Sequence, residues 1–185
     1  MKLFASKYID RLTNTLRKIS LDEIENFSNL LCNARKNQNT IFFIGNGGSA
    51  ATASHFANDL AIGLRNEPFK AISLCDNVAK ISAIGNDFGY DEIFSKQLNV
   101  FGNAGDILVA ISASGNSPNL LKAIKVAKTK KMTTVGLTSF DGGSLKKEAD
   151  FNVHVPTNIG EYGLAEDAHM ILDHLLSNYF IEQLR

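Results

Sequence analysis

Two side chains that could bind a metal or move protons stand four residues apart in the first third of the chain. His55 and Asp59 are at positions i and i+4, so on a helix they share one face. Such a pair can hold a divalent metal, or act as a general acid and base. The alternative is a structural hydrogen bond on a helix surface, which explains the pair better when no other residue is considered.

A second group of acidic and imidazole side chains lies near the C-terminus: Glu166, Asp167, His169, Asp173 and His174. Glu166 and His174 are two helical turns apart, about 12 Å along a helix axis. They could meet one metal only by reaching toward each other or across a subunit boundary. The spacing alone is therefore not diagnostic of a metal site.

A glycine-rich segment, Ile-Gly-Asn-Gly-Gly-Ser at residues 44–49, follows an apolar run. Gly47 and Gly48 permit positive φ and close approach of a ligand, and a helix N-terminus behind them would favour an anion. The spacing matches neither GxGxxG nor GxxxxGK[ST], so dinucleotide and P-loop sites are weakly supported. A glycine-rich turn without a ligand is the alternative.

A serine-rich segment, Ser-Ala-Ser-Gly-Asn-Ser at residues 112–117, has the same context. Three hydroxyl groups, a permissive glycine and the amides at a helix start can surround a phosphate without a lysine. An ordinary helix N-cap would need one hydroxyl group and not three. Ser112, Ser114 and Ser117 are therefore predicted to bind a phosphate group.

The segments that must position these residues alternate between strands and helices. Apolar, β-branched runs predict five strands, at residues 40–44, 69–74, 107–111, 133–138 and 151–155. Helices are predicted from an N-cap at Ser49 to about Leu64, at 77–84 and 91–100, from Pro118 to about Lys130, and briefly before the last strand. The strands are apolar without alternation, so both sheet faces should be covered. This pattern predicts a doubly wound parallel sheet with ligands at the carboxyl ends of its strands.

The ends of the chain are predicted to be helical. Residues 3–36 form one long or two shorter amphipathic helices, and residues 161–184 a closing helix with a wide apolar stripe. The length of 185 residues suits one domain. We therefore expect a single domain over 1–185, with a helical segment at 1–36 and an α/β core at 37–185.

Composition argues against several classes of partner. The 19 basic and 19 acidic residues balance, so no net field draws the chain to nucleic acid or to an anionic membrane. The first 16 residues lack the apolar stretch of a signal peptide, and no apolar run approaches the roughly 20 residues that span a bilayer. Cys32 and Cys75 are far apart and form no CxxC motif, which suits free thiols in a reducing cytoplasm. A cytoplasmic protein without nucleic-acid or membrane partners is expected.

Four blocks of sequence carry a resemblance to a known family. They read GNGGSAATASHFANDL at 45–60, AIGNDFGYDEIFSKQL at 83–98, GDILVAISASGNSPNLLKAI at 105–124 and TSFDGGSL at 138–145. In order and spacing they resemble the sugar isomerase (SIS) domain family, and more closely its phosphoheptose isomerases. The resemblance covers nearly the whole chain, and four ordered blocks are far more specific than any single motif.

The resemblance implies a flavodoxin-like sheet of five parallel strands with helices on both faces. It also implies a homotetramer with active sites at subunit contacts, acting on a small phosphorylated sugar. The residues that would contact this substrate are Asn46, Gly47, Gly48, Asn86, Asp87, Ser112, Ser114, Ser117 and Glu166.

The zinc ligands of the family are a His, a Glu, a Gln and a His, which fall on His55, Asp59, Glu166 and His174. One Zn²⁺ per site is therefore expected. Asp in place of Glu keeps a carboxylate but withdraws it by one methylene. Glu in place of Gln adds a negative charge, which should tighten cation binding and weaken Lewis acidity.

Two further positions depart from the family and bear on the identity of the substrate. Gly63 stands where the family has an Arg, with Arg65 two residues on. Gly163 replaces an Asp before the last helix.

The reaction implied is the isomerisation of sedoheptulose 7-phosphate to D-glycero-D-manno-heptose 7-phosphate, for lipopolysaccharide or capsule heptose synthesis. Asp59 would be the base that removes a proton next to the carbonyl, and His174 its acid–base partner. One alternative is a non-catalytic SIS-domain regulator that binds a phosphosugar or a protein, and the presence of both Asp59 and His174 argues against it. The other alternative, an isomerase of another phosphosugar, stays open.

The helical ends offer more apolar surface than one sheet can cover, so a symmetric oligomer is expected. For the tetramer that the resemblance implies, light scattering at micromolar concentration should give about four times the 20.2 kDa of one chain. A monomer at that concentration would contradict this prediction.

Overall fold

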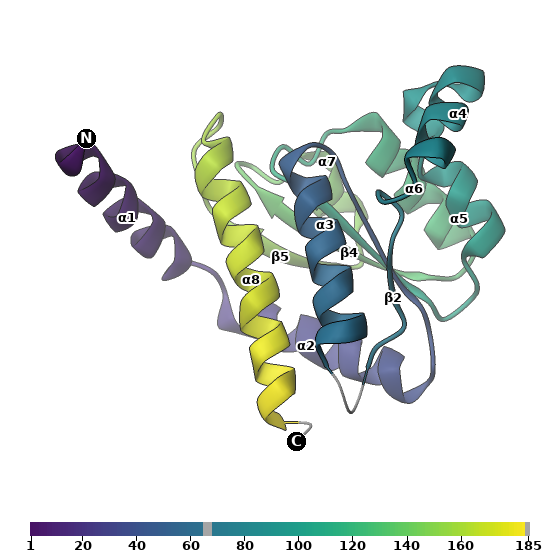
Figure 1. Ribbon diagram of the computed structural model, residues 1–185, viewed down its shortest axis with the longest axis horizontal. Helices are drawn as coiled ribbons and strands as arrows, with labels where there is room; N and C mark the ends of the chain where they lie inside the picture. Colours follow the sequence, from purple (N-terminus) through teal and green to yellow (C-terminus); the bar gives the residue numbers. More distant parts are fainter. Residues whose placement is uncertain (65–67, 184–185) are drawn as a thin grey trace.

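The computed structural model describes residues 1–64 and 68–183. Its centre is a sheet of five parallel strands in the order β2-β1-β3-β4-β5 (Figure 1). The strands are β1 (Ile41–Gly45), β2 (Ala71–Ser73), β3 (Ile107–Ser112), β4 (Thr133–Ser139) and β5 (Phe151–Val155). This order is that of flavodoxin-like sheets, so the predicted α/β fold is confirmed.

Helices cover both faces of the sheet. One face carries α2 (Leu21–Lys36), α3 (Gly48–Asn58) and α8 (Tyr162–Gln183). The other carries α4 (Val78–Phe88), α5 (Ser95–Phe101), α6 (Pro118–Thr129) and α7 (Gly143–Glu148). Neighbouring residues of β1 enter different cores, Phe43 the first and Phe42 the second, which is why the strands are apolar without alternation. Among the described residues, no helix is long and apolar enough to cross a membrane.

Aromatic side chains hold α3 and α8 on the first face. Phe56 of α3 packs on Phe43 of β1 and on Phe27 of α2, with ring centroids 4.8 and 6.2 Å apart. Phe180 of α8 packs on Phe69, just before β2, at 4.9 Å. The two helices also contact each other directly, so residues on their adjoining sides are brought together.

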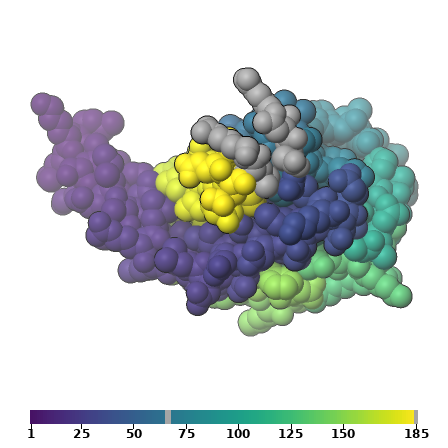
Figure 2. Space-filling model, turned by 90° about the horizontal axis from the view of Figure 1, so that it is seen from below, coloured from purple at the N-terminus to yellow at the C-terminus, as the bar shows by residue number. Residues whose placement is uncertain are grey.

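The N-terminal segment forms two helices, α1 (Lys2–Leu16) and α2, and not one long helix. Ser20 begins α2, because its Oγ accepts a hydrogen bond from the backbone nitrogen of Glu23 at 3.3 Å. α1 extends away from the rest of the molecule (Figures 1 and 2). It reaches the start of α8 through the Tyr8 hydroxyl, which donates to Asp167 at 2.6 Å.

The helix after β1 differs from its prediction at both ends. Ser49 is not its N-cap: α3 begins at Gly48, and Gly47 takes the N-cap position with a φ of 54°. Glycine adopts such a φ without steric cost, so the chain turns into the helix two residues earlier than expected. At the other end the α-helix gives way to a π-helical turn, Asp59–Gly63.

Smaller differences affect two other predicted helices. α4 runs on to Phe88, beyond the predicted end at residue 84. A 3₁₀ turn, Tyr90–Glu92, precedes α5, which begins at Ser95 instead of residue 91. The predicted last residue of the closing helix, 184, lies outside the described residues.

His169 is fully buried on α8, with its Nε2 3.3 Å from the Ser139 hydroxyl at the end of β4. Burial lowers the pKa of His169 to about 4, compared with about 6.5 for an unperturbed histidine. Between about pH 4 and pH 6.5 the unfolded chain therefore binds a proton that the folded chain does not. The free energy of unfolding should thus decrease as the pH falls from about 6.5 toward 4.

We expect His169→Gln to remove this pH dependence, because glutamine can keep a hydrogen bond to Ser139 but does not titrate. Between about pH 7 and pH 5, the free energy of unfolding of the original protein should fall by about 2 kcal/mol more than that of the variant. Urea unfolding of both proteins, at one fixed protein concentration and at each pH, measures this difference. Equal pH dependence in the two proteins would contradict the prediction.

Candidate active site

A cavity of about 180 Å³ lies at the carboxyl ends of β1 and β3, where the order of the strands reverses and such sheets usually bind ligands. Pockets for drug-sized ligands measure roughly 300–1,000 Å³, so this cavity suits one small group. The residues that line it are Asn46, Ser49, Ile111, Ser112, Ala113, Ser114, Ser117, Leu120, Tyr162 and Glu166. All three serines predicted to bind phosphate are among them.

The serine loop has the geometry of an anion site. Ser112 Oγ accepts a hydrogen bond from the backbone nitrogen of Gly115 at 3.0 Å, which bends the loop around the cavity. Ser117 occupies the N-cap position of α6, yet its side chain makes no capping hydrogen bond. Its hydroxyl is therefore available to a ligand, beside the positive end of α6. An ordinary N-cap does not explain this arrangement.

The segment after β4 supports the serine loop from behind. The backbone nitrogen of Leu145 donates to the carbonyl oxygen of Gly115 at 2.8 Å, and that of Ser144 donates to Asn116 Oδ1 at 3.0 Å. A Cβ atom on Gly115 would overlap the backbone of Gly142. The close approach of the two loops therefore requires glycine, whose φ here is 63°.

The glycine-rich turn forms another side of the cavity. Asn46 Oδ1 accepts hydrogen bonds from the Tyr90 hydroxyl at 3.0 Å and from Asn119 Nδ2 at 2.8 Å, so its side chain is fixed. A Cβ atom on Gly48 would overlap the carboxylate of Glu166. Glu166 thus lies at the start of α3, beside the phosphate-sized cavity.

Two predicted substrate contacts, Asn86 and Asp87, lie away from the cavity. Both are exposed near the end of α4, where Asn86 Nδ2 donates to Asp87 Oδ1 at 2.8 Å. Neither side chain lines the cavity of its own chain. Tyr90, a few residues further on, reaches the site in their place through its hydrogen bond to Asn46.

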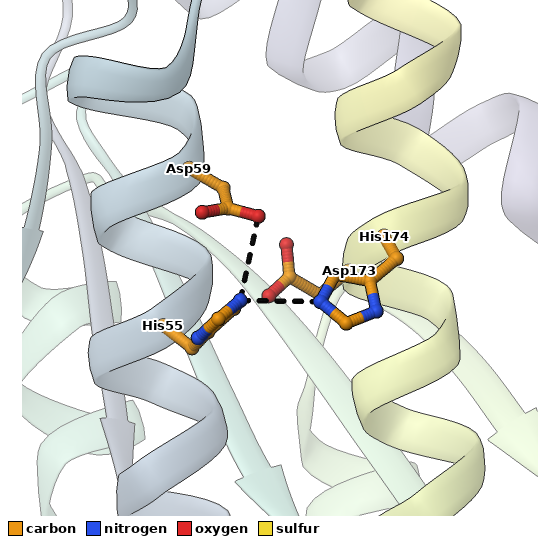
Figure 3. A group of neighbouring side chains, drawn as sticks. All are labelled: His55, Asp59, Asp173 and His174. Atoms are coloured by element: carbon orange, nitrogen blue, oxygen red, sulfur yellow. Dashed lines mark hydrogen bonds and ion pairs between the residues drawn. The ribbon is translucent and has the colours of Figure 1, made fainter.

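A cluster of potential metal ligands lies between α3 and α8 (Figure 3). It consists of His55, Asp59, Asp173 and His174, whose candidate ligand atoms are all within 4.8 Å of one another. The two histidine Nε2 atoms are 3.1 Å apart, and His55 Nε2 is 3.5 Å from Asp59 Oδ2. Asn58 Nδ2 holds the other Asp59 oxygen at 3.2 Å. A hydrogen bond confined to His55 and Asp59 therefore does not describe this group, because α8 adds a second imidazole, that of His174.

Asp173 forms the buried floor of this cluster. Its Oδ1 accepts a hydrogen bond from the Ser177 hydroxyl at 3.1 Å, whereas its Oδ2 is buried without a hydrogen-bond partner among the described residues. Burial, and then repulsion from Asp59, raise the pKa of Asp173 to about 7. Two imidazole nitrogens and two carboxylates, one with an unpaired buried oxygen, are a donor set that fits Zn²⁺ or another divalent first-row metal.

The structure brings together three of the four predicted metal ligands: His55, Asp59 and His174. It does not bring Glu166 to them. Glu166 contacts Gly48, which is seven residues before His55, or about 10 Å along α3. Because α8 is a continuous helix, its residues at 166 and 174 meet different parts of α3.

The sequence pattern places Asp173 among acidic neighbours without indicating a role for it, and it does not indicate Tyr162 at the cavity. A signal for Asp173 is present in the sequence: it falls on the apolar stripe of α8, between Leu172 and Leu176, where a charged side chain is unusual. Of the two departures from the family pattern, Gly63 ends the π-helical turn, whereas Arg65 lies outside the described residues. Gly163 lies in the first turn of α8, near the Tyr8 hydroxyl.

Comparison with known proteins gives one consistent family. Residues 7–139 match the family described as SIS domain. The phosphoheptose isomerase of Aliarcobacter butzleri is 36% identical over 165 residues, which cover 88% of this chain and 86% of the relative. The solved phosphoheptose isomerase of Neisseria gonorrhoeae has a TM-score of 0.87 at 32% identity, with 98% of each chain covered. That of Francisella tularensis has a TM-score of 0.90 at 28% identity, with 99% of each chain covered. The chain therefore belongs to the SIS domain family and, within it, to the phosphoheptose isomerases.

Proposed function

We propose that this protein isomerises sedoheptulose 7-phosphate to D-glycero-D-manno-heptose 7-phosphate. One arrangement carries the proposal: the same two helices, α3 and α8, border a phosphate-sized cavity and hold a His–Asp cluster. Gly48 and His55, which mark these two places on α3, are about 10 Å apart along the axis. A seven-carbon ketose phosphate has its carbonyl group and its phosphate near opposite ends, so one molecule could occupy both. The relatives named phosphoheptose isomerases support the same reaction.

In the proposed reaction Asp59 removes a proton from carbon 1 of the ketose. The electrons of that C–H bond form the double bond of an enediolate, and the ketone oxygen on carbon 2 becomes negative. His174 moves a proton between the two oxygens, a proton returns to carbon 2, and carbon 1 becomes the aldehyde. His55, Asp59 and His174 would hold a divalent metal, for which Zn²⁺ is the expected ion. When bound, the metal would stabilise the negative charge on the oxygens.

The wider setting of the reaction is also a proposal. Asn86 and Asp87 are exposed on α4 and lie away from the cavity of their own chain. They could contact substrate in the site of a neighbouring subunit, which agrees with a homotetramer of shared active sites. The reaction would take place in the cytoplasm and supply heptose for lipopolysaccharide or capsule.

An isomerase of another ketose phosphate is the second candidate, favoured by the residues that depart from the family pattern: Asp59, Gly63, Gly163 and Glu166. An assay against a panel of ketose phosphates, with and without zinc, separates the two. Sedoheptulose 7-phosphate should turn over fastest, and only with metal present. Preference for another ketose phosphate would support the second candidate. Turnover of none would leave a non-catalytic regulator and contradict the proposal.

We expect the double variant Ser114→Ala, Ser117→Ala to raise KM by at least about 100-fold, because hydrogen bonds to a charged group are each worth about 1.5–3 kcal/mol and about 1.4 kcal/mol is a factor of ten. The melting temperature should change little, since neither hydroxyl caps α6. Steady-state kinetics measure KM, with Ser82→Ala on the exposed side of α4 as a control. An unchanged KM in the double variant would contradict the phosphate assignment.

Asp59→Asn should abolish turnover and weaken metal binding, because the amide is neither a base nor a charged ligand. Asp59→Glu should keep activity, since it restores the reach that the family has at this position. His174→Ala should lose at least the ~10²-fold that a positioned acid–base group contributes. Circular dichroism checks that each variant is folded. Full activity in Asp59→Asn would refute the mechanism.

A further inference from the structure

We propose that Asp173 is the fourth protein ligand of the metal in this chain, and that Glu166 binds the substrate instead. This inference rests on the proposed function for the presence of a divalent metal, and it assigns the residues that hold it. Asp173 belongs to the set of ligand atoms within 4.8 Å of one another, together with His55, Asp59 and His174. Figure 3 shows the Asp173 carboxylate between α3 and α8, beside the histidine rings.

The state of the Asp173 carboxylate is an independent observation. The side chain is fully buried, and Ser177 satisfies only one of its oxygens. Its Oδ2 has no hydrogen-bond partner in the described part of the chain. An ionised, buried carboxylate in this condition is strongly unfavourable unless a cation compensates it. A divalent ion in the cluster would give Oδ2 a partner and screen the repulsion between Asp173 and Asp59.

Glu166 lies apart from the cluster and makes a different contact. Its carboxylate lies against Gly48 and lines the cavity at the strand ends. To bind the same metal it would have to leave this position and reach two turns along α8, about 12 Å. Where it stands, the carboxylate can accept hydrogen bonds from sugar hydroxyls that lie between the phosphate and the carbonyl group. We therefore assign it to substrate binding.

The experiment measures metal binding apart from catalysis. The full chain is stripped with a chelator and titrated with Zn²⁺, and separately with Mn²⁺, by calorimetry at about pH 8, where carboxylates are ionised. Asp173→Asn should weaken Zn²⁺ binding at least about tenfold, since removing even an outer-shell partner of a ligand commonly has that effect. Glu166→Gln should leave Zn²⁺ affinity within about twofold and raise the KM for the sugar phosphate. The matched control is Asp167→Asn, an exposed carboxylate on the same helix.

Melting temperatures give a second readout. Without metal, Asp173→Asn should melt above the original protein, because it removes an unpaired buried charge. Adding Zn²⁺ should raise the melting temperature of Asp173→Asn by less than it raises that of the original protein. Asp173→Leu, which suits the apolar stripe of α8, serves if the Asn variant does not fold, with the same expectations.

The outcomes separate the two proposals. If the original protein binds Zn²⁺ and Glu166→Gln loses that affinity while Asp173→Asn keeps it, the inference is overturned and the proposed isomerase stands. If the original protein binds neither metal yet isomerises the sugar phosphate, the inference and the expected cofactor both fail, but the proposed reaction does not. If it binds Zn²⁺ through Asp173 but turns over no ketose phosphate, the assignment of Asp173 as a metal ligand holds, whereas the proposed function and the substrate role of Glu166 both fail.

Discussion

The packing of α8 against α3 is the contact on which the rest of the site depends. Neither helix carries the whole cluster of potential metal ligands: α3 and its π-helical turn supply His55 and Asp59, and α8 supplies Asp173 and His174. Phe56 beneath α3 and Phe180 beneath α8 anchor the two helices to the same face of the sheet. Because both anchors are fully buried, the helices cannot slide without opening the core. In this arrangement the two Nε2 atoms lie 3.1 Å apart.

The parallel sheet positions the other part of the proposed site, the cavity at the strand ends. Its strands end together at one edge, and the reversal of strand order between β1 and β3 leaves a crevice there. The glycine turn after β1 and the serine loop after β3 face one another across it. The loop offers hydroxyl groups and the N-terminus of α6, and no lysine or arginine of residues 1–64 or 68–183 lines the cavity. The serine loop itself carries no charged side chain, so it would hold a phosphate without the strong attraction that would slow its release.

The cluster between α3 and α8 contains groups that stability alone would not favour. Asp173 interrupts the apolar stripe of α8, and the α-helix that carries His55 changes to a π-helical turn at Asp59. π-helical turns occur frequently at functional sites, and local departures from ordinary sequence–structure rules are concentrated there. Replacing Asp173 with leucine would suit the core better but would remove one of the two carboxylates of the cluster.

The sequence by itself determined the five strands, their alternation with helices, the serine loop, the pairing of His55 with Asp59 and the family resemblance. These features depend on periodicity, turn chemistry and short spacings, which are local properties of the chain. Only the tertiary structure decided which turn of α8 faces His55. Helical spacing shows which residues share a face, but not where along its length one helix meets another, which depends on packing in the core. That is why Glu166 lies at the cavity and Asp173 enters the cluster. The packing of α4 on the other face of the sheet likewise leaves Asn86 and Asp87 apart from the cavity of their own chain.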